Sequence, residues 1–122
     1  MAGEQSMLIR LYENFRNRDV DAMLAMMSPD VEWARDTGDG YLSGHDALRQ
    51  HWHREWQDFA TYLDPQSFSV TRNERTAVQV IRTVRDLQGR RLSETTLGHI
   101  FTIRDGLIVR LDIRESRAPD VA

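Results

Sequence analysis

The sequence lacks both cysteine and lysine. None of its 122 residues is a cysteine, and all sixteen basic residues are arginines. Without cysteine the chain can form no disulfide, no thiolate nucleophile and no thiolate metal site. Without lysine it has no Schiff-base nucleophile and no lysine general base. Covalent catalysis through sulfur or through a lysine amine is therefore excluded.

The sequence also lacks a strong charge and a long apolar run. Its formal net charge is −3, which gives no electrostatic reason to expect nucleic acid or an anionic membrane as the main partner. No apolar stretch approaches the ~20 residues of a transmembrane helix. The N-terminal MAGEQS has no basic segment followed by an apolar one, so we expect no signal peptide and a cytoplasmic location.

The composition is that of an ordinary globular domain. Hydrophobic residues make up 40% of the chain and charged residues 29%, as in folded rather than disordered proteins. A chain of this length buries roughly two thirds of the surface that it exposes when unfolded, which is enough for a core. We therefore expect a single domain over residues 1–122.

Two strands with strict alternation are predicted near the C-terminus, over 91–104 and 107–115. Arg104-Asp105-Gly106 is the turn between them, because glycine adopts positive φ without steric cost. One face of the two strands should carry a single row of side chains: Leu97, His99, Phe101, Ile103, Leu107, Val109, Leu111 and Ile113. The opposite face of the second strand should carry Ile108, Arg110, Asp112 and Arg114. His99 interrupts the apolar row, so the function depends on whether it faces a pocket or packs in the core.

The rest of the chain reads as helices followed by strands. Helices are predicted over about 4–17, 19–28 and 45–58, and further strands over 31–34, 66–72 and 76–86. Asp19 should cap the second helix, which should bury Met27 and end at Pro29. Asp64-Pro65 is predicted to be a turn. The third helix has an aromatic stripe: Leu48, Trp52, Trp56 and Phe59.

This order predicts an α+β fold. Three N-terminal helices should pack on a curved, mostly antiparallel sheet. A strongly bent sheet with a helix across its open side forms a cone. Sheet and helices cannot fill the wide end of a cone, so we expect a cavity there.

Three segments resemble the nuclear transport factor 2-like superfamily, in its SnoaL-like or ketosteroid-isomerase-like branch. They are RDVDAMLAMMSPDVEW, YLSGHDALRQHW and GHIFTIRDGLIVRLDIRE, and the resemblance extends over roughly 6–115. It implies a cone-shaped α+β barrel, a homodimer that packs through the outer sheet face and a small molecule bound inside the cone. The same fold hosts isomerases, cyclases, dehydratases, epoxide hydrolases and non-enzymatic subunits, so it does not by itself give the function.

The sequence departs from the ketosteroid isomerases at their catalytic positions. Their general-base aspartate matches Trp33, and their first-helix tyrosine matches Leu11, with Tyr12 about 100° round the helix. Their second oxyanion donor, an aspartic acid held neutral, matches His99. We therefore predict no steroid isomerisation. For the limonene epoxide hydrolases, the nearest candidates for the aspartate and arginine set are Arg82 and Asp112, and the alternation turns Asp112 outward.

Three residues are candidates for catalysis. His99 could act as a general acid or base, since its unperturbed pKa lies near 6.5, or it could be a hydrogen-bonded core histidine. Glu55 lies four residues after His51, so the two could form a base and its orienting partner, or a solvated pair on the flank of the helix. Asp36 could enter the pocket as a base, but an acid in a glycine-rich loop is more often a turn former.

Aromatic and apolar residues are the candidates for ligand binding. They are Trp33, Tyr41, Trp52, Trp56, Phe101, Leu111 and Ile113. Each aromatic side chain can bury ~150–250 Å², which suits a flat apolar ligand, although the same rings could simply fill the core. His45, His51 and His53 share a helix but His51 and His53 face different ways, and no glycine-rich phosphate loop exists. We therefore expect neither a metal nor a cofactor.

Two functional hypotheses follow. The first is a cytoplasmic homodimer that binds a small apolar organic molecule, with cofactor-independent acid–base chemistry of the isomerase, cyclase, dehydratase or hydrolase type. The alternative is a non-catalytic ligand-binding or dimerising accessory domain. In either case Arg110, Asp112 and Arg114 could form a dimer interface crossed by Arg–Asp pairs, or a solvated sheet face.

Overall fold

The computed structural model describes residues 2–35 and 39–115. The helices are α1 (Ala2–Arg16), α2 (Val20–Leu24) and α3 (His45–Asp58). The strands are β1 (Met27–Ala34), β2 (Tyr41–Ser43), β3 (Phe59–Val70), β4 (Thr76–Asp86), β5 (Arg91–Arg104) and β6 (Leu107–Glu115).

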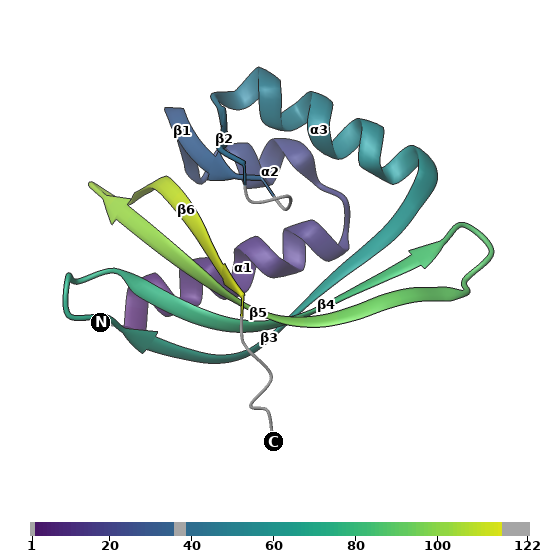
Figure 1. The fold of residues 1–122 in the computed structure, drawn as a ribbon. Helices are drawn as coiled ribbons and strands as arrows, with labels where there is room; N and C mark the ends of the chain where they lie inside the picture. Colours follow the sequence, from purple (N-terminus) through teal and green to yellow (C-terminus); the bar gives the residue numbers. More distant parts are fainter. Residues whose placement is uncertain (1, 36–38, 116–122) are drawn as a thin grey trace.

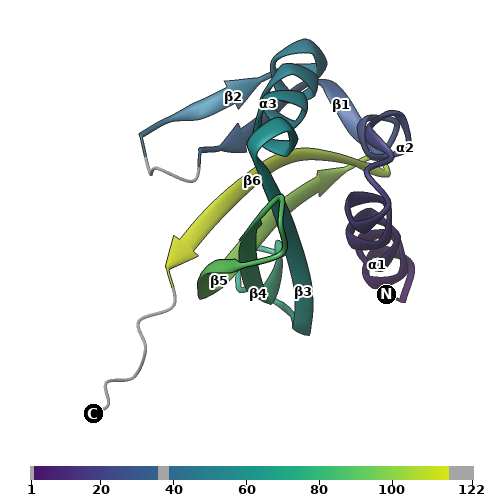
Figure 2. The ribbon, with the colours of Figure 1, turned by 90° about the vertical axis from the view of Figure 1, so that its right-hand side faces the viewer.

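The strands form one open, curved sheet in the order β2-β1-β6-β5-β4-β3. Neighbouring strands are antiparallel except β1 and β6, which are parallel. The helices lie on one side of this sheet (Figures 1 and 2). The helix α1 runs along the concave face, and α3 packs near β1, β2 and the start of β3. The predicted α+β class and the curved, mostly antiparallel sheet are confirmed. The sheet does not close into a barrel, since β2 and β3 remain as its edges.

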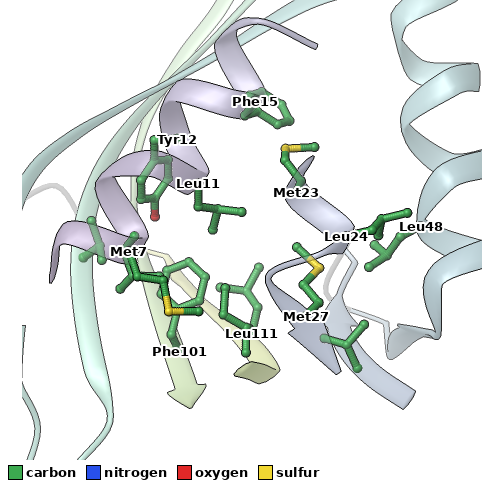
Figure 3. Close-up of a cluster of buried hydrophobic side chains, with 14 of the residues drawn as sticks. Met7, Leu11, Tyr12, Phe15, Met23, Leu24, Met27, Leu48, Phe101 and Leu111 are labelled. Carbon is green, nitrogen blue, oxygen red and sulfur yellow. The ribbon is translucent and has the colours of Figure 1, made fainter. Parts of the chain in front are cut away.

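The core lies between the helices and the concave face. The apolar stripe of α1 is buried along its length, at Met7, Leu8, Leu11, Tyr12 and Phe15. Figure 3 shows Leu11 and Tyr12 projecting from α1 toward Phe101 and Leu111, which are fully buried on β5 and β6. The alternation that predicted the buried row of these two strands is therefore confirmed for Phe101 and Leu111.

The β5–β6 hairpin closes through a two-residue turn. Asp105 and Gly106 both have positive φ, 52° and 79°, which matches the right-handed twist of the strands. The register then shifts: Thr102 pairs with Arg110 but Ile103 pairs with Ile108, so Val109 is an extra residue on β6. This bulge turns Ile108 into the core, where its exposed fraction is 0%. The prediction that Ile108 shares the outer face with Arg110 is wrong for that reason.

Proline does not act as a stop signal at either predicted place. The second helix ends at Leu24, and Met27 already belongs to β1, which contains Pro29. Pro29 lies where the register of β1 against β6 is irregular, between Met27 and Glu32, so no regular ladder bond is lost there. The predicted turn at Asp64-Pro65 is also wrong. Pro65 lies within β3, an edge strand whose pairing shifts between Pro65 and Ser67.

Some of the other predicted helix and strand boundaries agree with the structure and some do not. Asp19 caps α2 as expected, since its Oδ1 accepts a hydrogen bond from the backbone N–H of Ala22. The helix α3 and the strands β4, β5 and β6 have the predicted limits. The three-residue strand β2 was not predicted, and Phe59 begins β3 with 40% of its surface exposed instead of completing the aromatic stripe of α3. No described helix is both long enough and apolar enough to span a membrane.

Arg18 joins the end of α1 to α3 and β3. Its guanidinium donates hydrogen bonds to the carbonyl oxygens of Phe15 and Thr61, at 3.1 and 2.9 Å. The same group lies 4.7 Å from the ring centre of Trp56 and 5.5 Å from that of Tyr62. A half-buried cation among aromatic rings is held by both kinds of interaction, so Arg18 fixes the position of three elements around the concave face.

Replacing Arg18 by alanine is expected to lower the free energy of unfolding by about 1–2 kcal/mol, because both the cation–π contacts and the two hydrogen bonds are lost. Urea denaturation measures this change. Arg10→Ala, on the exposed side of α1, is the matched control and should change the free energy by less than about 0.5 kcal/mol. Equal losses in the two variants would contradict the structural role of Arg18.

Candidate functional site

Two small adjoining cavities lie between α1, α3 and the concave face of the sheet. The larger has a volume of about 30 Å³ and the smaller about 10 Å³. Five residues line both of them: Phe15, Trp33, Trp52, Leu63 and His99. A cavity needs roughly 10–15 Å³ to hold one water molecule, so this space accommodates very few. The interior of the cone is thus mostly filled in this structure, and the expectation of an open cavity at its wide end is wrong for this conformation, because aromatic side chains occupy the space that the backbone leaves.

Aromatic rings do most of the filling. The ring centres of Trp33 and Trp52 are 5.6 Å apart, and Trp52 also meets Phe15 at 6.3 Å, both nearly edge to face. Trp33 contacts Phe101 at 6.3 Å. Trp52 is almost completely buried, whereas Trp33 is only partly so. Trp33 is therefore the ring at the boundary between the core and the outside.

His99 lies at the centre of this region. The residue is 3% exposed, and its Nδ1 is 2.8 Å from the hydroxyl oxygen of Tyr12. The resemblance to ketosteroid isomerases had placed Leu11, not Tyr12, at the interior tyrosine position. In the structure both residues are buried and line the smaller cavity, and Tyr12 is the one bonded to His99. A sequence signal existed: a tyrosine within an apolar helical stripe needs a hydrogen-bond partner for its buried hydroxyl.

Burial keeps His99 uncharged. Burial and, to a smaller extent, the positive charge of Arg82 together lower the pKa of His99 from 6.5 to about 4. Burial also raises the pKa of Tyr12, so the phenol keeps its proton. Among the described residues the Tyr12 hydroxyl is bonded to His99 Nδ1, and we assign the phenol as the donor, because the un-ionised phenol then places its proton on an acceptor. The ring proton then sits on Nε2, which becomes the nitrogen that can donate to a ligand.

Polar side chains share the larger cavity with His99. They are His51, Glu55, Thr61 and Arg82. His51 Nε2 lies 3.6 Å from Glu55 Oε1, and the Glu55 side chain is only 15% exposed. The predicted pairing of these two residues on α3 is thus present, and the pair faces the cavity as well as the flank of the helix. Sequence reasoning had not assigned Thr61 to the site, and had considered Arg82 only as an epoxide-hydrolase residue.

The predicted ligand-binding residues separate into three groups. Trp33, Trp52, Leu111 and Ile113 line the larger cavity, and Phe101 lines the smaller. Trp56 lines neither, since it stacks on Trp52 at 6.2 Å and on the guanidinium of Arg18. The candidate base Asp36 lies outside the described residues. No group of three potential metal ligands occurs among the described residues.

Tyr41 was expected in the pocket but lies on the opposite face of the sheet. It pairs with Ala34 on β1, one position along from Trp33, and neighbouring side chains of a strand point to opposite faces. Its hydroxyl donates to Asp112, and Arg110 lies over its ring at 4.5 Å. Sequence alternation within the 41–43 segment was too short to reveal this orientation.

The outer face therefore holds a polar network within one chain. Asp112 faces outward as predicted and forms ion pairs with Arg110 at 3.2 Å and with Arg75 at 3.6 Å. Arg110 also pairs with Glu32, its neighbour on β1, at 3.3 Å. These Arg–Asp pairs are made without a second subunit. The homodimer through this face stays a prediction.

One protein family matches most of this chain. The model of the SnoaL-like domain matches residues 8–111. No curated protein matches the chain with significance. Among solved structures, a nuclear transport factor 2-like protein of unknown function from Burkholderia pseudomallei is 24% identical, with 95% of this chain and 92% of that chain covered and a TM-score of 0.80.

Two further structures are similar over most of their length. TerC, crystallised with polyporic acid, is 26% identical, with 93% of this chain and 92% of that chain covered and a TM-score of 0.79. A candidate polyketide cyclase from Xanthomonas campestris is 21% identical, with 94% and 91% covered and a TM-score of 0.80. These similarities agree with the open, curved sheet and the packed helices described above.

Proposed function

Because this chain belongs to the SnoaL-like domain family, we propose that it binds a small aromatic molecule beside His99 and carries out cofactor-independent acid–base chemistry of the cyclase type on it. The observation that carries this proposal is that a neutral, buried histidine and a carboxylate line the same cavity. His99 is oriented by Tyr12, and Glu55 is oriented by His51. Membership of the ketosteroid-isomerase-like branch stays a prediction.

The two groups suit different halves of an acid–base reaction. Nε2–H of His99 donates a hydrogen bond to a ligand carbonyl oxygen and stabilises the negative charge that develops there when an adjacent proton is removed. Glu55 accepts that proton, since its carboxylate lines the same cavity from α3. The resulting enolate carbon is the nucleophile that a ring closure requires.

The similar structures support an aromatic or polyketide-like ligand. One of them is a candidate polyketide cyclase, and TerC was crystallised with polyporic acid. The aromatic lining of the cavity suits a flat ring system for the same reason. A ligand of that size needs roughly 300–1,000 Å³, so binding requires the partly exposed Trp33 to turn away from Trp52. Tryptophan fluorescence is therefore expected to change on binding.

The test is a titration followed by a turnover assay. Polyporic acid and a panel of enolisable aromatic polyketides are titrated against the protein by tryptophan fluorescence, and products are analysed by mass spectrometry with no cofactor added. His99→Phe is expected to slow conversion about a hundredfold, because phenylalanine keeps a ring of similar size but has no N–H to donate to the oxyanion. His53→Gln, exposed on α3, is the matched control and should react at the wild-type rate.

The outcomes separate the two hypotheses. Binding with no conversion by the wild type would favour the non-catalytic accessory domain. Conversion that His99→Phe leaves unchanged, in a variant with a wild-type circular dichroism spectrum, would remove His99 from the mechanism. Failure to bind any member of the panel would contradict the aromatic ligand class.

A further inference from the structure

We infer that the hydroxyl of Thr61 is a ligand-binding group, and that with Arg82 and His99 it selects ligands that carry an acidic oxygen, such as a phenol or an enol. This inference rests on the proposed function, because it needs the cavity to admit a ligand. It adds a specificity-determining residue and a substrate class to the site.

The hydroxyl of Thr61 is buried without a partner. The residue is 2% exposed, and its Oγ1 has no hydrogen-bond partner among the described residues. A buried polar group that lacks a partner destabilises the fold, so its presence calls for a reason. Of the three described side-chain atoms in this condition, on Ser28, Trp56 and Thr61, only that of Thr61 belongs to a residue that lines the larger cavity.

A second buried threonine, Thr76, does have a hydrogen-bond partner for its hydroxyl. Thr76 is 6% exposed, and its hydroxyl donates to Glu4 Oε1 at 3.2 Å. Valine has nearly the same shape as threonine and suits a strand equally well. The hydroxyl at position 61 therefore serves neither packing nor strand formation. A partner that enters the cavity would satisfy it.

Thr61 is held firmly in place. It pairs with Val84 of β4, and its carbonyl oxygen accepts the hydrogen bond from Arg18. Its β-branched side chain has few rotamers. The hydroxyl is thus presented to the cavity by a fixed strand, as a binding group that needs no reorganisation on binding.

The neighbouring groups favour an oxygen that accepts hydrogen bonds and carries negative charge. Arg82 pairs with Leu63, two residues beyond Thr61, so both side chains lie on the concave face. The positive charge of Arg82 reaches the ring of His99, whose pKa it lowers. A guanidinium and the Nε2–H of His99 can only donate hydrogen bonds, and the hydroxyl of Thr61 can donate as well. Three donors, one of them cationic, around one small cavity match a phenolate or an enolate oxygen.

The test compares two probes with the same ring system, one with two acidic hydroxyl groups and one with both hydroxyls methylated. The affinities of 1,3-dihydroxynaphthalene and its dimethyl ether are measured by fluorescence titration for the wild type, Thr61→Val and the control Thr76→Val. Thr61→Val is expected to weaken binding of the dihydroxy compound about tenfold and to leave the ether within about twofold. Its urea midpoint should be unchanged or higher, since the unpartnered hydroxyl is gone. Thr76→Val should lose stability and keep its affinity for both probes.

The inference can fail separately from the proposed function. If the wild type binds the probes but Thr61→Val leaves the preference for the dihydroxy compound intact, the role of Thr61 is overturned while the ligand site stands. A loss of stability in Thr61→Val equal to that in Thr76→Val would overturn it too, since the hydroxyl would then serve the fold. If the wild type binds neither probe, both the aromatic ligand class and this inference are overturned.

Discussion

Replacing Trp52 by alanine is expected to lower the free energy of unfolding by about 3–5 kcal/mol, the usual range for removing a buried aromatic ring. Trp52 is 3% exposed, and its ring contacts those of Phe15, Trp33 and Trp56. Truncation would leave a void among three rings that cannot all collapse into it, because each is held by its own neighbours. Urea denaturation followed by circular dichroism measures the change.

Phe59→Ala is the matched control for this prediction. Phe59 follows α3 directly, but 40% of its surface is exposed, so its removal creates little void. We expect a loss of less than about 1 kcal/mol. If Trp52→Ala cost no more than the control, Trp52 would not be packed as the structure has it, and the filled interior of the cone would be in doubt.

The second large effect is a loss of stability in mild acid that depends on His99. Its pKa is about 4 in the folded protein, against 6.5 for an unperturbed histidine. Between these two values the unfolded chain binds a proton at His99 that the folded chain does not, so stability rises with pH across the window. The contribution of His99 to the free energy of unfolding is complete above pH 6.5 and is lost as the pH falls to about 4. At 1.36 kcal/mol per pKa unit, the loss is roughly 3 kcal/mol.

Burial is the main reason why the effect should be large, because an imidazolium at this position would lose its hydration, and the groups around His99 act in the same direction. Tyr12 of α1 donates to its Nδ1, Arg82 of β4 adds positive charge, and His51 and Glu55 of α3 line the same cavity. A proton on the ring would turn Nδ1 from an acceptor into a donor and place a second positive charge near Arg82. Both changes oppose protonation in the folded state.

The measurement is a series of urea denaturation curves between pH 4 and 7. His99→Gln, which cannot titrate, is expected to show a flatter dependence on pH than the wild type in this window. His53→Gln removes an exposed histidine and should keep the wild-type slope. Parallel curves for the wild type and His99→Gln would show that another group is responsible for any acid sensitivity.

Side-chain alternation and helical spacing were sufficient to predict those helices and strands whose position depends only on which side chains are buried. The limits of α3, β4, β5 and β6 follow from such patterns, and so does the inward orientation of His99 and Phe101. The bulge at Val109 could not be foreseen, because an extra residue in a strand changes the register without changing the local composition. The two prolines misled for a related reason, since a proline is tolerated in an edge strand or an irregular pairing that only the assembled sheet reveals.

The candidate site was predictable in part. His99 stood out as a polar residue in an apolar row, and His51 and Glu55 as a pair with helical spacing. Tyr12 and Thr61 were missed because their importance depends on partners far away in the chain: Tyr12 bonds a histidine 87 residues later. Thr61 belongs to a segment that sequence reasoning did not assign to a strand, so no face could be given to its side chain.

Pro65 has a consequence beyond the local register. β3 is a terminal strand of an open sheet, and Phe59, Tyr62 and Val70 on it are exposed, which is the combination that allows one molecule to extend its sheet onto another. Proline has no backbone N–H, so it divides the free edge into two short stretches, 59–64 and 66–70. Neither stretch offers the long, regular row of donors that an incoming strand requires. The proline therefore protects the protein against edge-to-edge polymerisation at high protein concentration.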